Sequence, residues 1–317
     1  MKKAFLTCTL FISIVCLQSF GQAPDNLSAK VTYAFSHIQD TAQKDQPFKE
    51  QMVLLLGQNS SVYLSLDKVK EDEQRKLDIT QQIKNAVPGN MSINVKSSNK
   101  KLNGAELYLF TKEKQFFSKQ RMVNNYLIAE PFPEMDWKIG NDTLTISGLA
   151  CQMATTQFKG RNYTAWFCPE LPFSSGPWKL NGLPGLIVEA YDINKEVVFK
   201  FDGFEQVNNA GKVIEDEVKD GSGVKMSMKG LSSGDLLNAQ TIALPSDGIR
   251  TTQKEFNKLK EAMKKDPQGF VNSAFAGSGS NVKVSQKSKI SVPGIAKISA
   301  IPSIVNINNP IELPDTK

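Results

Sequence analysis

Short segments in which apolar and polar residues alternate recur along most of this sequence. Val31, Tyr33 and Phe35 alternate with small or polar residues, which is the pattern of a strand with one buried face. Residues 50–56 and 61–66 flank the turn-forming letters Gly-Gln-Asn-Ser, and this arrangement predicts a β-hairpin. Similar strands, separated by turn residues, continue well past the middle of the chain. The pattern predicts a mainly β fold built on an antiparallel sheet that is curved or partly closed.

One or two accessory helices are expected beside this sheet. Residues 67–86 are densely charged and predict either a solvated helix or a mobile insertion. Residues 252–265 begin with a capping box, in which the Thr252 hydroxyl caps a backbone amide and the Glu255 carboxylate reaches back to the capping residue. Apolar residues then recur at helical spacing, so we expect this second helix to dock on the core.

The sequence predicts one folded domain between a leader and a tail. Residues 1–21 combine two lysines, a short apolar run and small residues before a cleavage point, as a secretory signal peptide does. Residues 22–275 are expected to form a single β domain, and the proline-rich residues 276–317 an extended C-terminal tail. The sequence after the leader contains no apolar run long enough for a transmembrane segment. We therefore expect an exported protein of the periplasm, with an extracellular location as the alternative.

Composition and charge narrow the classes of function. The 317 residues are 40% hydrophobic and 22% charged, as in ordinary globular proteins. The net charge of +6 is scattered along the chain, so nucleic acid is not an expected partner. His37 is the only histidine in the sequence, which removes most histidine-based metal sites and most nucleophile–histidine pairs. We expect no metal, no cofactor and no enzymatic activity.

A candidate hairpin contains the two cysteines that remain after the leader is removed. Residues 151–168 are rich in threonine and aromatic residues, with a Lys-Gly pair at their centre. A two-residue turn at that pair places Phe158 opposite Arg161 and, further out, Cys151 opposite Cys168. In an oxidising compartment this register predicts a disulfide between the two cysteines. The alternative is a pair of separate, buried thiols.

Residues 182–187 read Gly-Leu-Pro-Gly-Leu-Ile, and they end a longer segment that begins at Gly176. This hexapeptide is the signature of the GLPGLI family of exported bacterial proteins, which the sequence resembles. Matching letters extend the resemblance to residues 160–161, to Trp166 and to the Asn-Pro-Ile-Glu-Leu letters at residues 309–313. The resemblance implies export in a diderm bacterium, and it implies no particular molecular activity.

The loop 169–185 contains four prolines and three glycines, which restrict and shape its backbone. Loops of this kind on a rigid sheet often carry binding residues. The candidate contacts to a ligand or partner are Phe173, Pro177, Trp178, Leu183 and Pro184. The residues expected to shape the motif are Trp166, Gly176, Gly182 and Gly185. The alternative, which we favour, is a lid that folds over an open end of the sheet and buries its aromatic side chains.

These features predict non-enzymatic binding of an apolar or peptide ligand, or of an outer-membrane protein partner, through the β scaffold and the loop 169–185. Residues 182–199 also resemble strand-turn-strand endings of periplasmic lipoprotein carriers, which hold acyl chains in curved sheets. The alternative is a hydrolase that acts on peptide or glycan through carboxylates or His37. An apolar concavity under the loop favours binding, and two buried acids around a polar cleft favour hydrolysis.

Overall fold

The computed structural model describes most of the expected domain and three short pieces of the expected tail. The described residues are 24–85, 102–207, 217–219, 225–227, 234–267, 269–270, 273, 284–285, 289–290 and 307–314. The expected leader therefore lies outside the described residues.

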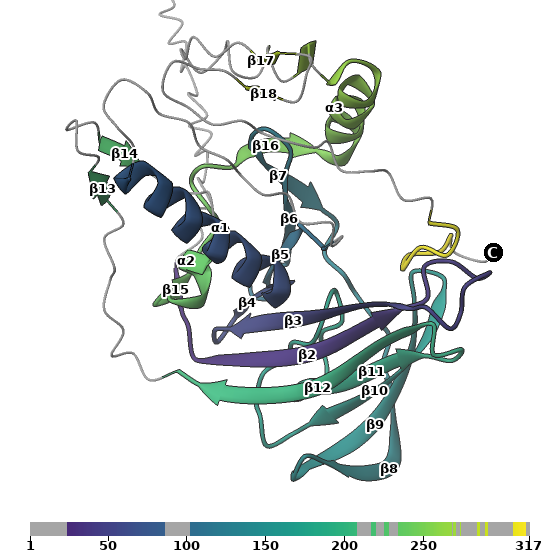
Figure 1. Cartoon of the computed structure of the whole chain (residues 1–317). Helices are drawn as coiled ribbons and strands as arrows, with labels where there is room; N and C mark the ends of the chain where they lie inside the picture. Colours follow the sequence, from purple (N-terminus) through teal and green to yellow (C-terminus); the bar gives the residue numbers. More distant parts are fainter. Residues whose placement is uncertain are drawn as a thin grey trace, which may run out of the picture.

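Twelve strands form one large, curved sheet, as the alternating pattern predicts (Figure 1). The sheet contains β2 (Ala29–His37), β3 (Phe48–Leu56), β4 (Ser60–Ser65), β5 (Glu106–Phe110), β6 (Gln115–Arg121), β7 (Asn125–Glu130), β8 (Lys138–Ile146), β9 (Leu149–Phe158), β10 (Arg161–Cys168), β11 (Leu186–Asp192), β12 (Val197–Gln206) and β16 (Ile249–Thr252). Their spatial order is β16-β7-β6-β5-β4-β3-β2-β12-β11-β10-β9-β8. Neighbours are antiparallel except for β16 and β7, which run parallel, so the sheet is mixed. Its two edge strands, β16 and β8, do not pair with each other, and the sheet therefore does not close into a barrel.

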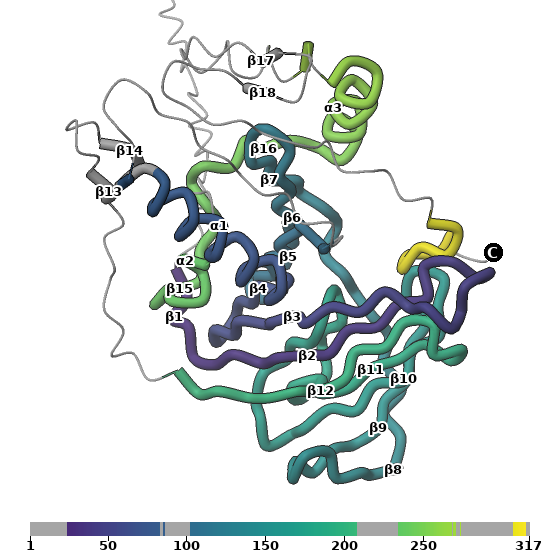
Figure 2. The backbone as a smooth tube through the Cα atoms, in the orientation of Figure 1, coloured from purple at the N-terminus to yellow at the C-terminus, as the bar shows by residue number. Residues whose placement is uncertain are grey.

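The remaining described elements are short strand pairs and three helices. The pairs are β1 (Asp25–Asn26) with β15 (Thr241–Ile242), β13 (Glu217–Lys219) with β14 (Lys225–Ser227), and β17 (Val284–Ser285) with β18 (Lys289–Ile290). The helices are α1 (Leu66–Lys84), α2 (Gly234–Leu237) and α3 (Gln253–Lys265). Figure 2 shows that the backbone of the large sheet extends from β16 and β7 at one end to β8 at the other.

The strand β3 is buried on both faces and separates two hydrophobic cores. Met52, Leu54 and Leu56 join the first core, which also receives side chains from β2, β9 to β12 and the loop 169–185. Val53 and Leu55 point the other way and join the second core, which lies against α1 and β15. Burial on both faces explains why this strand is a continuous apolar run instead of an alternating one.

The charged segment predicted at residues 67–86 forms the helix α1, which packs on β3. Its contact with the second core includes Val69, which is fully buried. Asp72 is also buried, and it forms ion pairs with Lys68 and Arg75 on the same helix. The segment is thus a helix and not a mobile insertion, and most of its charged side chains, such as Lys68 and Arg75, are partly buried.

The predicted capping box is present at the start of α3. The Glu255 backbone N–H donates to the Thr252 hydroxyl, and the Thr252 backbone N–H donates to the Glu255 carboxylate. The helix docks on β7 through Phe256, whose ring lies 5.4 Å from that of Tyr126. Residues 252–265 therefore form the predicted helix in the predicted place beside the core.

The predicted hairpin at residues 151–168 is confirmed as β9 and β10. Its ladder pairs Phe158 with Arg161, and the turn residues Lys159 and Gly160 both have positive φ, as a two-residue hairpin turn requires. The predicted disulfide is not present in this structure, which holds Cys151 and Cys168 as buried, free thiols. Burial and the neighbouring Cys168 raise the pKa of Cys151 to about 11, so its thiol is protonated at neutral pH.

Candidate functional site

The loop 169–185 folds back onto the start of β11. The backbone N–H of Leu186 donates to the Leu171 carbonyl at 2.9 Å, and that of Ile187 donates to the Ser175 carbonyl at 3.0 Å. Gly185 lies so close to the end of β10 that a β-carbon there would be 2.3 Å from the Cys168 carbonyl oxygen. The loop therefore lies against the first core as a lid, which is the arrangement we favoured from the sequence.

The candidate contact residues of this loop are distributed between the core and the surface. Pro177 and Leu183 are buried. Trp178 is half-buried, and its ring packs 5.6 Å from Phe158 and 6.5 Å from Phe199 in the first core. Pro177 and Leu183 therefore have no surface to offer a partner, and Trp178 mainly packs the lid onto the sheet.

The remaining residues of the predicted motif lie at the edges of the lid. Phe173 is half-buried against the first core, Pro184 is exposed, and Trp166 is half-buried on β10. Gly176 is fixed by packing, because a β-carbon there would lie 2.7 Å from Ile187. Gly182 has a φ of +91°, which favours glycine at this position.

A hollow of about 400 Å³ lies where the loop 169–185 begins. It is lined by Thr143, Leu144, Thr145, Ala150, Cys151, Gln152, Pro169 and Glu170. The hollow adjoins β8, which among the described strands pairs only with β9 and forms one edge of the large sheet. Two large apolar side chains of β8 are exposed to solvent, Ile139 by 50% and Leu144 by 48%. The lid also holds the residue that precedes β8, since the indole N–H of Trp137 donates to the Asn181 carbonyl at 2.7 Å.

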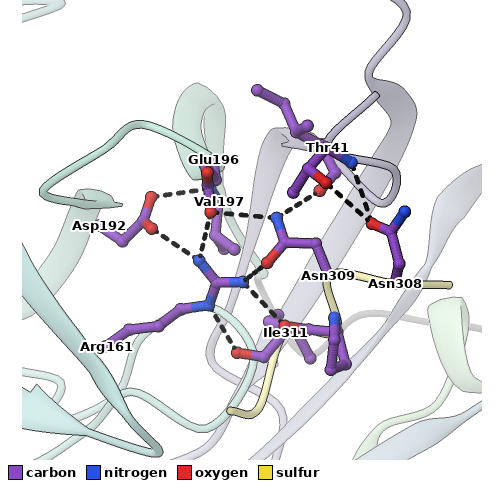
Figure 3. A network of polar contacts seen from close by, with 10 residues as sticks. Thr41, Arg161, Asp192, Glu196, Val197, Asn308, Asn309 and Ile311 are labelled. Carbon is purple, nitrogen blue, oxygen red and sulfur yellow. Dashed lines mark hydrogen bonds and ion pairs between the residues drawn. The ribbon is translucent and has the colours of Figure 1, made fainter. Parts of the chain in front are cut away.

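A second constellation surrounds the guanidinium of Arg161, at the start of β10 (Figure 3). The side chain is 2% exposed and pairs with Asp192, at the end of β11, at 2.8 Å and with Glu196, in the turn before β12, at 3.1 Å. Asp192 is itself held in place, because it accepts the backbone N–H of Val197 at 2.8 Å. The paired charges offset part of the cost of burying the guanidinium.

The remaining donors of Arg161 bind residues 307–314, which we call the C-terminal segment. Its Nη2 donates to the Asn309 side-chain oxygen at 2.7 Å and to the Pro310 carbonyl at 2.8 Å, and its Nε donates to the Ile311 carbonyl at 3.0 Å. Gly160 makes room beneath the segment, because a β-carbon there would lie 2.7 Å from Leu313. Part of the expected tail is thus fixed against the domain.

Asn309 is the residue of the C-terminal segment that the domain contacts most closely. Its side-chain amide donates to the Ile38 carbonyl at 2.7 Å and to Glu196 at 3.0 Å, and its backbone N–H donates to the Gln39 carbonyl at 3.0 Å. We call the surface that binds the segment the Arg161 cradle. It consists of residues 37–41, 159–161 and 192–196, together with Lys179 of the loop.

Lys179 joins the lid to the C-terminal segment and to the sheet. Its ammonium group bonds to Glu312 at 2.6 Å and to Glu130 of β7 at 2.8 Å, and it lies 5.2 Å from the ring of Phe116. Burial by itself lowers the pKa of Lys179, but the bonds to the two carboxylates outweigh that effect and raise it. Lys179 is therefore charged, and it holds three parts of the fold together.

His37 lies at the end of β2, inside the cradle. Burial and the positive charge of Arg161 lower its pKa, while a hydrogen bond to the Asn309 backbone and the charges of Asp192 and Glu196 act in the opposite direction. Its Nε2 atom makes no hydrogen bond within the described residues. The imidazole is 4% exposed, so it faces protein and not a cleft that a substrate enters.

The cradle was not predicted from the sequence, although Arg161 and Asn309 stand among the letters that carry the family resemblance. Arg161 follows a hairpin turn, where an exposed basic residue is ordinary, and Asp192 and Asn309 each stand among common turn residues. The signal that could have pointed to the cradle was the presence of charged and amide residues, such as Arg161 and Asn309, in motifs that are otherwise apolar. The spacing along the chain gives no indication that these residues meet.

The described part of the chain offers neither a metal-binding cluster nor a membrane-spanning helix. Its His, Cys, Asp and Glu side chains form no group of three or more that is arranged to hold a metal ion. Within the same residues, no helix is both long enough and apolar enough to cross a membrane.

Comparison with known proteins gives a short family match and distant structural neighbours. A family model described as "Protein of unknown function (Porph_ging)" matches residues 155–189, which run from β9 through the loop 169–185 into β11. The match supports a likeness to a family of unknown function over this segment, and the GLPGLI assignment stays a prediction. No curated protein matches the sequence.

The structural neighbours are similar only at a low level. PNGF-II in its P21 and C2 crystal forms is 12% and 11% identical, with TM-scores of 0.40 and 0.44 over 60% and 73% of this chain. The match covers 29% and 32% of those chains, so this protein spans about a third of their length. An uncharacterized conserved protein from Thermus thermophilus is 8% identical, with a TM-score of 0.32 over 72% of this chain and 91% of that one. Similarity at this level supports no functional argument.

Proposed function

We propose that the protein is an exported, non-catalytic binding protein of the cell envelope, and that it binds an extended peptide segment of a partner at the β8 edge. The observation that carries the proposal is the combination of a long edge strand, two exposed apolar side chains and the adjoining hollow. Export rests on the leader-like residues 1–21 of the sequence.

An edge strand offers unpaired backbone groups to any segment that adopts a β conformation. Such a segment gains main-chain hydrogen bonds from the edge and specificity from pockets for alternate side chains. The strand β8 is nine residues long, and most of it is exposed on both faces. Leu144 lines the hollow, and Ile139 is exposed further along β8, beyond a register shift against β9. These two side chains suit a partner segment that carries apolar residues.

A photo-reactive amino acid at position 144 of the full chain, exposed to envelope extracts of the source organism, tests this proposal. We expect it to capture a partner whose cross-linked residues form a short segment with alternating apolar positions. A synthetic peptide of that segment is then expected to protect the β8 amides from hydrogen exchange. The substitution Leu144→Glu should weaken binding of the peptide about tenfold or more, because it places a charge at an apolar contact.

The matched control is Leu77 on α1, which is 57% exposed. The helix α1 packs on β3, and several strands separate β3 from β8 in the sheet. The same photo-reactive group at position 77 should not capture the partner, and Leu77→Glu should leave the affinity for the peptide unchanged. Equal capture at both positions would contradict the proposal. Native and lipid mass spectrometry of the purified protein would also contradict it by finding a stoichiometric lipid in place of a peptide.

A further inference from the structure

One face of the strands β9, β10 and β11 carries an apolar row that ends in a carboxylate. Strand pairing sets Met153 of β9 opposite Trp166 of β10, and Trp166 opposite Glu189 of β11, so the three side chains share one face of the sheet. The neighbours of Trp166 along its strand, Ala165 and Phe167, are buried, whereas Trp166 itself is half-buried. The row therefore lies on the more open side of these strands.

The hollow beside the loop 169–185 continues this row to the β8 edge. Leu144 of β8 pairs with Cys151 of β9, and both residues line the hollow. Cys151 stands two residues before Met153, so the alternation of the strand places both on the same face. Leu144, Cys151, Met153 and Trp166 thus form a strip in which each residue neighbours the next, and we call it the outer strip. Leu144 is 48% exposed, and Met153 is half-buried like Trp166.

Two carboxylates flank the outer strip. Glu170 is exposed and is the charged residue among those that line the hollow, while Glu189 is half-buried at the end of the row. Burial and Cys168 raise the pKa of Cys151, and the charges of Glu189 and Glu170 raise it further, so both carboxylates act electrostatically at the hollow. Within the described residues neither carboxylate forms a hydrogen bond or an ion pair. The outer strip therefore lies in a locally negative field.

An apolar strip between two carboxylates is complementary to a side chain with an apolar stem and a cationic end. Lysine and arginine bury their methylene stems along apolar surface and keep the charged end in a polar environment. Their cationic groups also bind the face of tryptophan, which is the aromatic side chain that binds cations best. A purely apolar segment would cover Glu189 and leave its charge unpaired, which is costly, and an acidic segment would be repelled by both carboxylates.

We propose that the peptide segment bound at the β8 edge carries lysine or arginine among its apolar residues, with the stems of these side chains on the outer strip and their charged ends at Glu170 and Glu189. The inference rests on the proposed function, because it specifies the chemistry of the partner at that same edge. The whole chain carries a net charge of +6, so it does not attract basic segments in general. The two carboxylates therefore make the binding of a basic segment specific to this surface.

A displayed library of random decapeptides, selected on the full chain and sequenced, tests this inference. We expect the wild-type chain to enrich peptides that carry lysine or arginine at fixed positions between apolar residues. The charge-reversed variant Glu170→Lys, at an exposed loop position, should enrich aspartate or glutamate at one of those positions instead, because like charges now exclude the basic residue. The control variant Glu113→Lys, in the exposed turn between β5 and β6, should enrich the same basic peptides as wild type.

The affinity of one enriched peptide, made synthetically and measured by calorimetry, gives the size of the effect. Glu170→Gln and Glu189→Gln should each weaken its binding about two- to fivefold, as the loss of a partly exposed ion pair does. Added salt should weaken its binding to wild type more than its binding to the variant that carries both substitutions. Glu113→Gln should leave the affinity unchanged.

The outcomes distinguish this inference from the proposed function. Peptides that protect the β8 amides from hydrogen exchange without a preference for lysine or arginine would overturn the inference and leave binding at the β8 edge intact. Equal affinity of the enriched peptide for wild type, Glu170→Gln and Glu189→Gln would do the same. A wild-type chain that enriches no peptide relative to Leu144→Glu would overturn both.

Discussion

His37 shows how a single residue can couple the cradle to pH. The imidazole is almost fully buried beside Arg161, and its hydrogen bond goes to the backbone of Asn309 in the C-terminal segment. The folded domain therefore favours the neutral form of the imidazole, which lies between the Arg161 guanidinium and the Asn309 backbone. Asp192 and Glu196 reduce this preference without reversing it, because burial and Arg161 outweigh them.

The lowered pKa of His37 makes stability depend on pH in a defined direction. Below the ordinary histidine value of about 6.5 the unfolded chain takes up a proton that the folded chain resists, so the free energy of unfolding should fall as the pH drops. Urea denaturation of wild type and of His37→Gln at pH 8 and pH 5.5 measures the effect. We expect wild type to lose more stability than the variant over this interval. Because His37 is the only histidine, an equal loss in both proteins would contradict the assignment.

Glu196 contributes in a separate, more acidic range. Burial alone raises the pKa of Glu196, but hydrogen bonds from Arg161 and Asn309 outweigh it and hold the pKa below its usual value. Its stabilising contribution is therefore complete above the ordinary glutamate range of about 4.3 and is lost as the pH falls below it. The interval from pH 8 to pH 5.5 lies above the ordinary glutamate value, so the histidine contribution can be measured there with little titration of Glu196.

Among the elements, the loop 169–185 depends most strongly on single glycines. Gly185 has a φ of +155° and lies against the backbone at the end of β10, so both its conformation and its lack of a side chain are needed. The match to the family of unknown function includes this residue and the loop around it. The motif is thus explained by the geometry of a lid without reference to any ligand.

The substitution Gly185→Ala should destabilise the domain by about 3 kcal/mol, because backbone strain adds to a direct clash with the Cys168 carbonyl. The control is Gly104→Ala, at an exposed site with no atom within 4 Å of the added carbon, where we expect little change. Thermal unfolding of both variants measures the difference. Similar melting temperatures for the two variants would show that the lid adjusts at no cost, contrary to the expected strain.

For the whole molecule, the important feature is that the two cores share the strand β3. Leu54 and Leu55 are adjacent and equally buried, yet they belong to the first and the second core respectively. All three tryptophans pack against the first core, whereas α1 covers the second. Tryptophan fluorescence therefore reports on the first core, whereas helical circular dichroism reports on α1 at the second core together with α3 on β7.

We expect Leu54→Ala and Leu55→Ala each to destabilise the protein by about 2–5 kcal/mol, as large-to-small changes in a packed core do. Because one strand carries both side chains, each substitution should shift the fluorescence and dichroism transitions together. Chemical denaturation followed by both signals tests this expectation. A shift in one transition alone would mean that the cores unfold independently.

The sequence determined the features that depend on local periodicity. Alternation in β2, the turn between β3 and β4, the register of β9 with β10 and the capping box of α3 all follow from residues close together in the chain. The fold class and the helix at residues 252–265 were therefore predictable, whereas the charge of residues 67–86 left a mobile insertion open as an alternative. The disulfide was not, because the register that brings two cysteines into neighbouring strands does not decide whether their sulfur atoms bond.

Only the tertiary structure decided which distant residues meet. Arg161, Asp192 and Asn309 are separated by stretches of chain whose spacing contains no common period. The pairing of β10 with β11 brings the first two together, and docking of the C-terminal segment adds the third. The same holds for the position of β8 at the sheet edge and for the lid over the first core. Periodicity specifies which face of a strand is buried, whereas the pairing order of strands and the docking of a tail depend on the balance of all long-range contacts.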